Sequence, residues 1–235
     1  NASGTGAFAQ SSYDSPTDKL QSYFGRAIFD YDGKYVFNAI IRADGSSKFG
    51  SNNKYGYFPS FSGAWNVDRE GFLPQAFNTL KIRGGFGITG NQDFPSGLSL
   101  TTYQPLSGNY RPVNFGNIDL KWEQTAQGNV GVDFGLMQNR LSGSLDFYQK
   151  TTKDILVQRY QLQRPSDSPF GYVNLDKTRF INKGVEFAMN YNVIKKDDFS
   201  VEFGGNDAYK ITKATGPTAD GFDNPVVVKT GRLGG

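Results

Sequence analysis

The sequence predicts an all-β fold: an incomplete antiparallel β-barrel of the kind that crosses a membrane with strands. Three observations support this prediction. Apolar and polar residues alternate through eight segments of about 10 to 14 residues, whereas strands of globular proteins usually have about 5 to 6. The connections between these segments alternate between short turns and long polar stretches. Only 37% of the 235 residues are hydrophobic, which suits a wall in which every second strand residue faces lipid.

The clearest element is a hairpin over residues 20–44. Its arms are joined by Asp32-Gly33, a pair that favours a type I′ turn because both central residues need a positive φ. One face of the hairpin is apolar with aromatic ends, and the other carries arginines and aspartates. This pattern fits a soluble sheet packed on a core, and it also fits a membrane sheet whose apolar face meets lipid.

Six further strands are expected along the chain. They cover residues 57–67, 80–89, 123–136, 141–150, 179–193 and 199–212. We also expect one helical turn near residues 70–73 and a strand near residues 5–11. Pro59 is expected close to the start of its strand, because proline has no N–H to donate to a ladder.

The connections differ in length on the two sides of the predicted sheet. Short ones at 32–33, 68–78, 137–139 and 195–198 alternate with long polar ones at 44–56, 90–121, 151–178 and after 213. We expect at most one internal hairpin in 90–121 and a plain loop in 151–178. Such long loops are unusual in a compact soluble domain but ordinary on the outer side of a membrane barrel. A tilted strand of about 12 residues also rises roughly 28 Å, which matches a bilayer core.

Charge and composition exclude several classes of function. The net charge is +3, which gives no basic footprint for nucleic acid. The chain has no cysteine and no histidine, so it holds no thiolate or histidine metal site and no Ser-His-Asp triad. We therefore expect no enzyme, no catalytic residue, no cofactor and no metal site.

Five stretches of the chain follow one another in an order typical of a known family. They are SYFGRAIFDYDGKYVFNAIIRADGSSKFG, YGYFPSFSGAWNV, LKIRGGFGITGNQ, IDLKWEQTAQGNVGVDFGLMQNRLSGSLDFYQKTTKDIL and INKGVEF. Together they cover most of residues 20–212 and resemble the barrel of SusC/RagA-type TonB-dependent transporters. The resemblance implies a 22-stranded bacterial outer-membrane barrel, of which residues 1–235 would form about ten strands. The plug and the C-terminal strands of such a barrel are expected elsewhere, in a longer protein.

The resemblance also implies a function. It implies import of a glycan or peptide nutrient, driven by the TonB complex through the plug, with a SusD-type surface lipoprotein on the outer face. This chain would supply part of the barrel wall, in contact with outer-membrane lipid, and part of the outer loops. Two other functions stay open on the residues alone: a non-transport structural or adhesive barrel, and a soluble β-sandwich binding module.

Three sets of residues are candidates for functional contacts. The charged residues expected to face the lumen, where they would pair across strands, are Arg26, Asp30, Arg42, Asp44, Lys81, Arg83, Glu123, Asp133, Asp146 and Glu186. The residues expected to face lipid are Phe29, Phe37, Ile41, Phe61, Trp65, Phe86, Val130, Val132, Phe134, Leu145, Phe187 and Val201. Outer-loop aromatics are expected either to stack on sugar rings or peptide side chains, or to pack the loops together; they are Tyr103, Tyr110, Phe115, Tyr160 and Tyr172.

Overall fold

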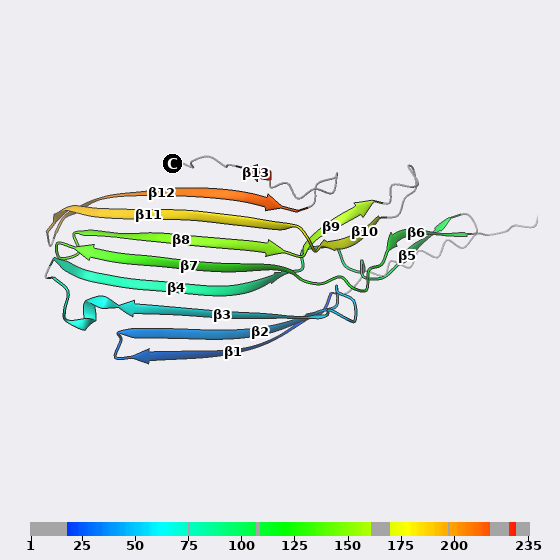
Figure 1. The fold of residues 1–235 in the computed structure, drawn as a ribbon, viewed down its shortest axis with the longest axis horizontal. Coiled ribbons are helices and arrows are strands. Elements are labelled where there is room, and N and C mark those ends of the chain that lie inside the picture. Colours follow the sequence, from blue (N-terminus) through cyan, green and yellow to red (C-terminus); the bar gives the residue numbers. More distant parts are fainter. Residues whose placement is uncertain are drawn as a thin grey trace, which may run out of the picture.

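The fold is a single large antiparallel sheet with a smaller sheet at one end (Figure 1). The computed structural model describes residues 18–74, 76–106, 109–160, 170–196, 198–216 and 226–228. Within these residues the large sheet has nine strands in the order β1-β2-β3-β4-β7-β8-β11-β12-β13. The smaller sheet has the order β5-β6-β10-β9. No pairing joins β1 to β13 within the described residues, so the large sheet is open there, as expected for part of a barrel wall.

The strands of the large sheet are long. They are β1 (Leu20–Tyr31), β2 (Tyr35–Ser46), β3 (Tyr55–Asn66), β4 (Phe77–Asn91), β7 (Glu123–Leu136), β8 (Leu141–Lys153), β11 (Arg179–Lys195), β12 (Ser200–Thr215) and the short β13 (Val226–Val228). The smaller sheet contains β5 (Thr102–Leu106), β6 (Asn109–Phe115), β9 (Ile155–Tyr160) and β10 (Phe170–Leu175). A 3-10 helix, η1 (Val67–Glu70), connects β3 to β4.

The first hairpin forms as its sequence predicts. Asp32 and Gly33 have φ values of 54° and 60°, and the backbone N–H of Lys34 donates to Tyr31 O at 2.9 Å. Asp30 Oδ1 accepts a hydrogen bond from Gly33 N at 2.8 Å and so holds the turn from its first arm. This register pairs β1 with β2 along their whole length, so the apolar residues of both arms share one face.

The alternation of short and long connections is confirmed. The short turns lie at one end of the large sheet, and the long connections with the smaller sheet lie at the other (Figure 1). Below, these ends are called the short-turn end and the long-loop end. The turn between β7 and β8 uses three successive residues with positive φ, Met137, Gln138 and Asn139. Such an asymmetry is typical of outer-membrane barrels.

Several predicted boundaries need correction. The 151–178 segment is more than a loop, because β9 and β10 lie in it and pair antiparallel. The helical turn spans Val67–Glu70, a little earlier than expected. Pro59 lies inside β3, where it pairs with Ile41, and the pairing of β3 with β4 begins only at the next residue, Ser60. The strand expected at residues 5–11 lies outside the described residues.

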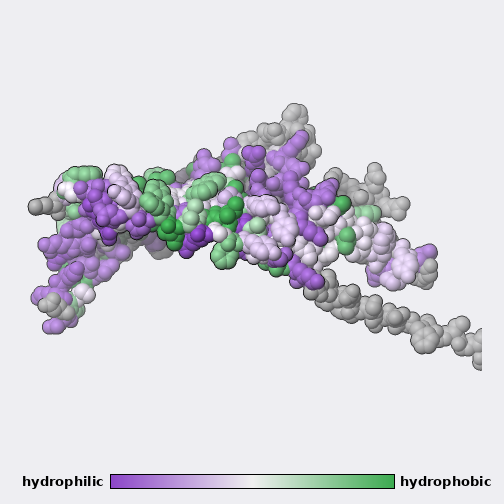
Figure 2. Space-filling view, turned by 90° about the horizontal axis from the view of Figure 1, so that it is seen from below, coloured by the Kyte–Doolittle hydropathy of each residue, from purple (hydrophilic) through white to green (hydrophobic). Residues whose placement is uncertain are grey.

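The apolar stripe of the large sheet is left uncovered in the described part of the chain. Phe37 and Phe86 are 54% and 47% exposed, although Phe86 lies well inside the long strand β4. In Figure 2, hydrophobic residues gather near the middle of the long axis. The uncovered stripe argues against the β-sandwich alternative, since a sandwich buries this stripe under a second sheet. No helix among the described residues is long and apolar enough to cross a membrane.

Candidate functional site

The strand register separates the large sheet into two chemically different faces. Ala39 pairs with Phe61, Phe61 with Phe86, and Phe86 with Gly128, so one face can be followed across the sheet. We call it the apolar face. It carries Phe29, Phe37, Ile41, Phe61, Trp65, Phe86, Val130, Val132, Phe134, Leu145, Phe187 and Val201. We call the opposite side the polar face, and it carries the charged residues expected to line the lumen.

Aromatic side chains mark the short-turn end of the apolar face. The rings of Tyr35 and Trp65 stack with their centroids 6.1 Å apart and an interplanar angle of 12°. Both side chains point a polar atom at Glu70: Trp65 Nε1 donates to Oε1 at 3.1 Å, and the Tyr35 hydroxyl donates to the same oxygen at 2.5 Å. This arrangement is typical of an interfacial belt, where a ring lies in the apolar layer while its polar atom faces water.

Glu70 is the electrostatic centre of this belt. Besides the two aromatic donors, Lys34 Nζ lies 3.3 Å from Glu70 Oε2. The hydrogen bond from Tyr35 lowers the pKa of the Glu70 carboxyl most, and the bond from Trp65 adds to it. Each of these contacts favours the charged carboxylate, so the belt depends on Glu70 remaining ionised.

The polar face carries an ion-pair network across three strands. Arg83 of β4 lies 3.1 Å from Asp133 of β7 through Nε and 2.7 Å from Asp146 of β8 through Nη2. Gly131 lies between them in the register, opposite both Arg83 and Asp146. A Cβ at Gly131 would lie 2.9 Å from Arg83 Cζ and still closer to Asp146 Oδ1, so the missing side chain makes room for the network.

The other charged residues of this set have separate partners. Arg42 Nε lies 2.6 Å from Asp44 Oδ1, and Arg26 Nε donates to Asn38 Oδ1 at 2.7 Å. Glu123 lies at the long-loop end of β7, where it accepts from Asn91 Nδ2 and from the backbone N–H of Leu156, both at 3.2 Å.

Lys81 and Glu186 have neither a side-chain hydrogen bond nor an ion pair within the described residues. Yet Lys81 is opposite Asp133 in the register, and Glu186 is opposite Asp146. Glu186 does line a polar hollow of about 390 Å³, together with Arg83, Asp146 and Lys150. The hollow therefore presents charges of both signs on the face expected to line the lumen.

The β5–β6 hairpin presents two exposed tyrosines. Tyr103 pairs with Pro112 and Pro105 with Tyr110, so the two tyrosines and two prolines share one face of the hairpin. We call this set the Tyr/Pro face. Tyr103 is 61% exposed and Tyr110 is 76% exposed. Sequence reasoning identified the tyrosines as candidates but missed both prolines, which alternation within the hairpin would have placed beside them.

The remaining outer-loop aromatics lie in different surroundings. Tyr172 of β10 packs against Phe94 with ring centroids 6.0 Å apart, so it helps to pack the loops together. Phe115 ends β6 and is partly exposed. The backbone of Tyr160 ends β9, but its side chain lies outside the described residues.

A small aromatic core supports the smaller sheet at the long-loop end. Its buried residues are Phe49, Phe58, Phe94, Leu98, Leu120 and Trp122, with Tyr172 packed against them. The Trp122 ring lies 4.8 Å from Phe49 and 5.4 Å from Phe58, measured between centroids. The core therefore joins the loops to β3 and to the start of β7.

Lys121 supports the same region electrostatically. Its Nζ lies 2.9 Å from Asp154 and 3.0 Å from Asp176, and the hydrogen bond to Asp154 contributes most to raising the pKa of Lys121. Asn174 Nδ2 also donates to the carbonyls of Lys121 and Asp154, each at 2.8 Å. These contacts fasten β10 to the segment that leads into β7.

No group of metal-binding side chains occurs among the described residues. Two surfaces have a chemistry suited to ligand contact: the polar face of the wall and the Tyr/Pro face of the β5–β6 hairpin. The first could line an aqueous passage, and the second offers flat rings for stacking.

Comparison with known proteins identifies the family. The model of the family described as "TonB dependent receptor-like, beta-barrel" matches residues 1–231. TonB-dependent receptor P39 of Formosa agariphila is 36% identical over 195 residues, which cover 80% of this chain and 18% of that protein. TonB-dependent receptor SusC of Bacteroides thetaiotaomicron is 33% identical over 233 residues, which cover 90% of this chain and 22% of that protein. The chain thus spans about a fifth of the length of these relatives.

Solved structures agree with the sequence comparison. The RagAB peptide transporter superposes with a TM-score of 0.75 at 26% identity, over 87% of this chain and 23% of that one. The siderophore receptor PirA of Pseudomonas aeruginosa has a TM-score of 0.52 at 11% identity over 89% of this chain and 39% of that one, and so shares the fold alone. With the family match over nearly its whole length, this chain belongs to the TonB-dependent receptor β-barrels of the outer membrane and resembles their SusC/RagA members.

Proposed function

We propose that this chain is part of the wall and outer loops of a TonB-dependent importer of glycan or peptide nutrients. The remainder of the importer, including the plug that engages the TonB complex, would come from the rest of the protein. A SusD-type lipoprotein would cover its outer face. The relatives named above support this proposal, since they are described as TonB-dependent receptors and a peptide transporter.

The two faces of the large sheet also support the proposal. The apolar face would contact lipid, and the polar face would line the passage beside the plug. The hollow with Arg83, Asp146, Lys150 and Glu186 fits a wet lumen, because charged groups left in hydrocarbon would be costly. A purely adhesive barrel would have no need for such a lining, which favours transport over that alternative.

The single observation that points to substrate contact is the Tyr/Pro face. It lies on the long-loop side, where nutrient would arrive from outside, and its tyrosines are the most exposed aromatic residues among the described side chains of the smaller sheet. Tyrosine rings stack on sugar rings and on apolar peptide side chains alike, and the neighbouring prolines extend the flat surface. We assign Tyr103 and Tyr110 as contacts for the nutrient.

The test is uptake of labelled nutrient by cells that carry the full-length protein with Tyr103→Ala and Tyr110→Ala together. An aromatic contact contributes about 1 kcal/mol, so two lost contacts should weaken the apparent affinity roughly thirtyfold. Leu100→Ala is the control, because Leu100 is equally exposed in the same loop but lies outside the Tyr/Pro face. Equal uptake by the double variant and the control would contradict the assignment.

A further inference from the structure

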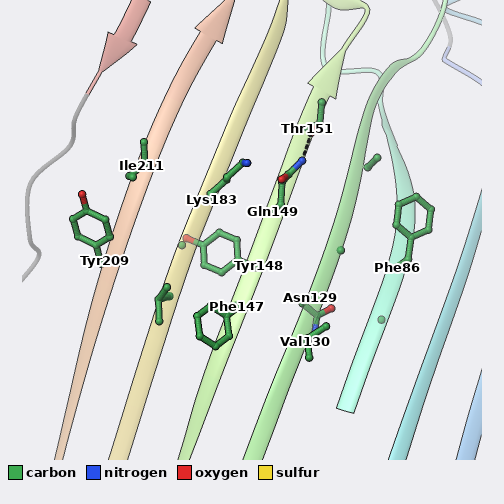
Figure 3. Close-up of a pocket in the computed structure, with 15 residues that line it drawn as sticks. Phe86, Asn129, Val130, Phe147, Tyr148, Gln149, Thr151, Lys183, Tyr209 and Ile211 are labelled. Atoms are coloured by element: carbon green, nitrogen blue, oxygen red, sulfur yellow. Dashed lines mark hydrogen bonds between the residues drawn. The ribbon is translucent and has the colours of Figure 1, made fainter. Parts of the chain in front are cut away.

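The apolar face contains a hollow whose two ends differ in chemistry. It has a volume of about 710 Å³ and is lined by residues of β4, β7, β8, β11 and β12 (Figure 3). Phe86, Val130 and Phe147 line it over β4, β7 and β8. Towards the long-loop end, Lys183 of β11 lies opposite Gln149 of β8, and Gln149 Nε2 donates to Thr151 Oγ1 at 3.5 Å. The hollow is therefore mainly apolar, with a few polar side chains towards its long-loop end.

The floor of the hollow is open because β7 has small residues there. Gly128 pairs with Phe86 on one side and with Gln149 on the other. A Cβ added at Gly128 would meet no atom closer than 3.8 Å, so the space above it is empty rather than filled by a neighbour. A larger residue at this position would fill the hollow without a backbone clash.

Lys183 lies at the boundary between polar and apolar residues on this face. It is four residues from Arg179, at the long-loop end of β11, and the next residues on the same face are Val185, Phe187 and Met189. Four residues of a tilted strand correspond to a rise of roughly 9 Å. Ile181 alone separates Lys183 from Arg179 on this face, so Lys183 lies near the long-loop edge of the apolar band, within reach of the lipid headgroups.

Lys183 is one of several cations on this part of the apolar face. Register and alternation also place Lys153, Arg179 and Lys213 there. None of the four has an ion pair within the described residues. Asp207 of β12 lies on the same face, opposite Phe187 in the register. Phe187 is four residues farther from the long-loop end than Lys183. Among the described residues, no acidic side chain pairs with this cationic patch where it borders the hollow.

We propose that this hollow binds a phosphorylated acyl glycolipid of the outer leaflet. One acyl chain would lie over Gly128 between Phe86 and Phe147, and a headgroup phosphate would accept hydrogen bonds from Lys183. Charge complementarity favours this occupant, because a second copy of the chain or a neutral lipid would leave the cations unpaired. The proposal rests on the lipid-facing orientation of the apolar face, which is part of the proposed function.

The test is binding of diphosphoryl lipid A to the detergent-purified full-length protein, measured by native mass spectrometry. Lys183→Gln should weaken binding about fivefold to tenfold, since a lysine near anionic lipid contributes roughly 1 kcal/mol or somewhat more. Lys183→Arg should restore it. Gly128→Val should weaken binding by filling the hollow. Lys210→Gln is the matched control, because Lys210 is opposite Gly184 in the register and lies on the polar face one strand away.

A dephosphorylated lipid A provides the second arm. It should bind wild type and Lys183→Gln equally. Three results would each overturn the proposal. Lys183→Gln and Lys210→Gln could have equal effects on binding, or Gly128→Val could bind lipid A fully. The third is a dimer that depends on Lys183 and holds no lipid. Nutrient uptake by the same variants is measured in parallel. If Lys183→Gln binds diphosphoryl lipid A as well as wild type does, while wild type takes up nutrient normally, the lipid site is rejected and the importer assignment stands.

Discussion

Gly131→Ala should destabilise the barrel wall, although alanine is usually the better residue in a strand. The added methyl group would lie 2.9 Å from Arg83 Cζ and even closer to the Asp146 carboxylate. Both neighbours are ends of flexible side chains, so they can move, but only by breaking the 2.7 Å contact between Arg83 and Asp146. The cost is therefore that of a lost ion pair rather than of a backbone shift.

The magnitude follows from the exposure of the pair. The side chains of Arg83 and Asp146 are 31% and 21% exposed, so the contact is partly screened by solvent and contributes about 1 to 2 kcal/mol. Replacing glycine with alanine stabilises the folded state by roughly 0.5 kcal/mol or a little more, because it lowers the backbone entropy of the unfolded chain. Gly128→Ala has only this second effect, because its Cβ would meet nothing closer than 3.8 Å. The two variants should thus differ by about 1 to 2 kcal/mol.

The assay is the rate at which the detergent-solubilised full-length protein loses its folded mobility on an unboiled gel at raised temperature. If the contact between Arg83 and Asp146 is already broken in the transition state for unfolding, Gly131→Ala should unfold roughly tenfold faster than Gly128→Ala. In a double-mutant cycle, Asp146→Ala should remove most of the effect of Gly131→Ala, since the methyl group then has room. Equal unfolding rates for the two alanine variants would refute the steric reasoning.

Two further predictions concern the membrane orientation of the wall and its aromatic belt. Val130→Arg should sharply reduce the amount of folded protein recovered from outer membranes, because a cation on the lipid side near the midplane costs about 2 to 4 kcal/mol. Asn129→Arg, one residue away on the polar face, should be tolerated. Equal recovery of the two variants would contradict the assignment of the faces. The pKa of Glu70 is lowered by Tyr35 and Trp65, so its stabilising effect is present above the ordinary pKa of a glutamate and disappears as the pH falls through the lowered value. Thermal unfolding at decreasing pH should therefore show the advantage of wild type over Glu70→Gln shrinking on acidification, and an advantage independent of pH would contradict this explanation.

Alternation along single strands predicts most of the large sheet. It gave β7 the bounds Glu123–Leu136 that the structure shows, and it assigned all the apolar-face residues to one side. The turn at Asp32-Gly33 could also be predicted from the sequence, because a positive φ at two successive residues is a local requirement. Such features depend on neighbouring residues alone, so the sequence contains them directly.

Features that depend on distant residues were less predictable. Lys81 is directly opposite Asp133, yet Asp133 pairs with Arg83, whose planar guanidinium reaches two carboxylates at once. The aromatic core needs residues from the loop before β3, from β3 itself and from the long connection between β4 and β7, and no local sequence pattern predicts it. The Tyr/Pro face also depends on the pairing of two strands, since Tyr103 meets Pro112, and Pro105 meets Tyr110, only once β5 and β6 are in register.

The aromatic core at the long-loop end has a thermodynamic consequence for capture of a ligand. A recognition loop that is mobile before binding must lose that freedom when it meets its target, and each side chain it orders weakens the complex by about 0.5 to 1.5 kcal/mol. Here Phe49, Phe58 and Trp122 already hold the base of the outer sheet against the barrel wall. If the hairpin that projects from this base contacts nutrient as proposed, it would do so in a largely preset geometry, so even shallow stacking contacts would contribute to affinity.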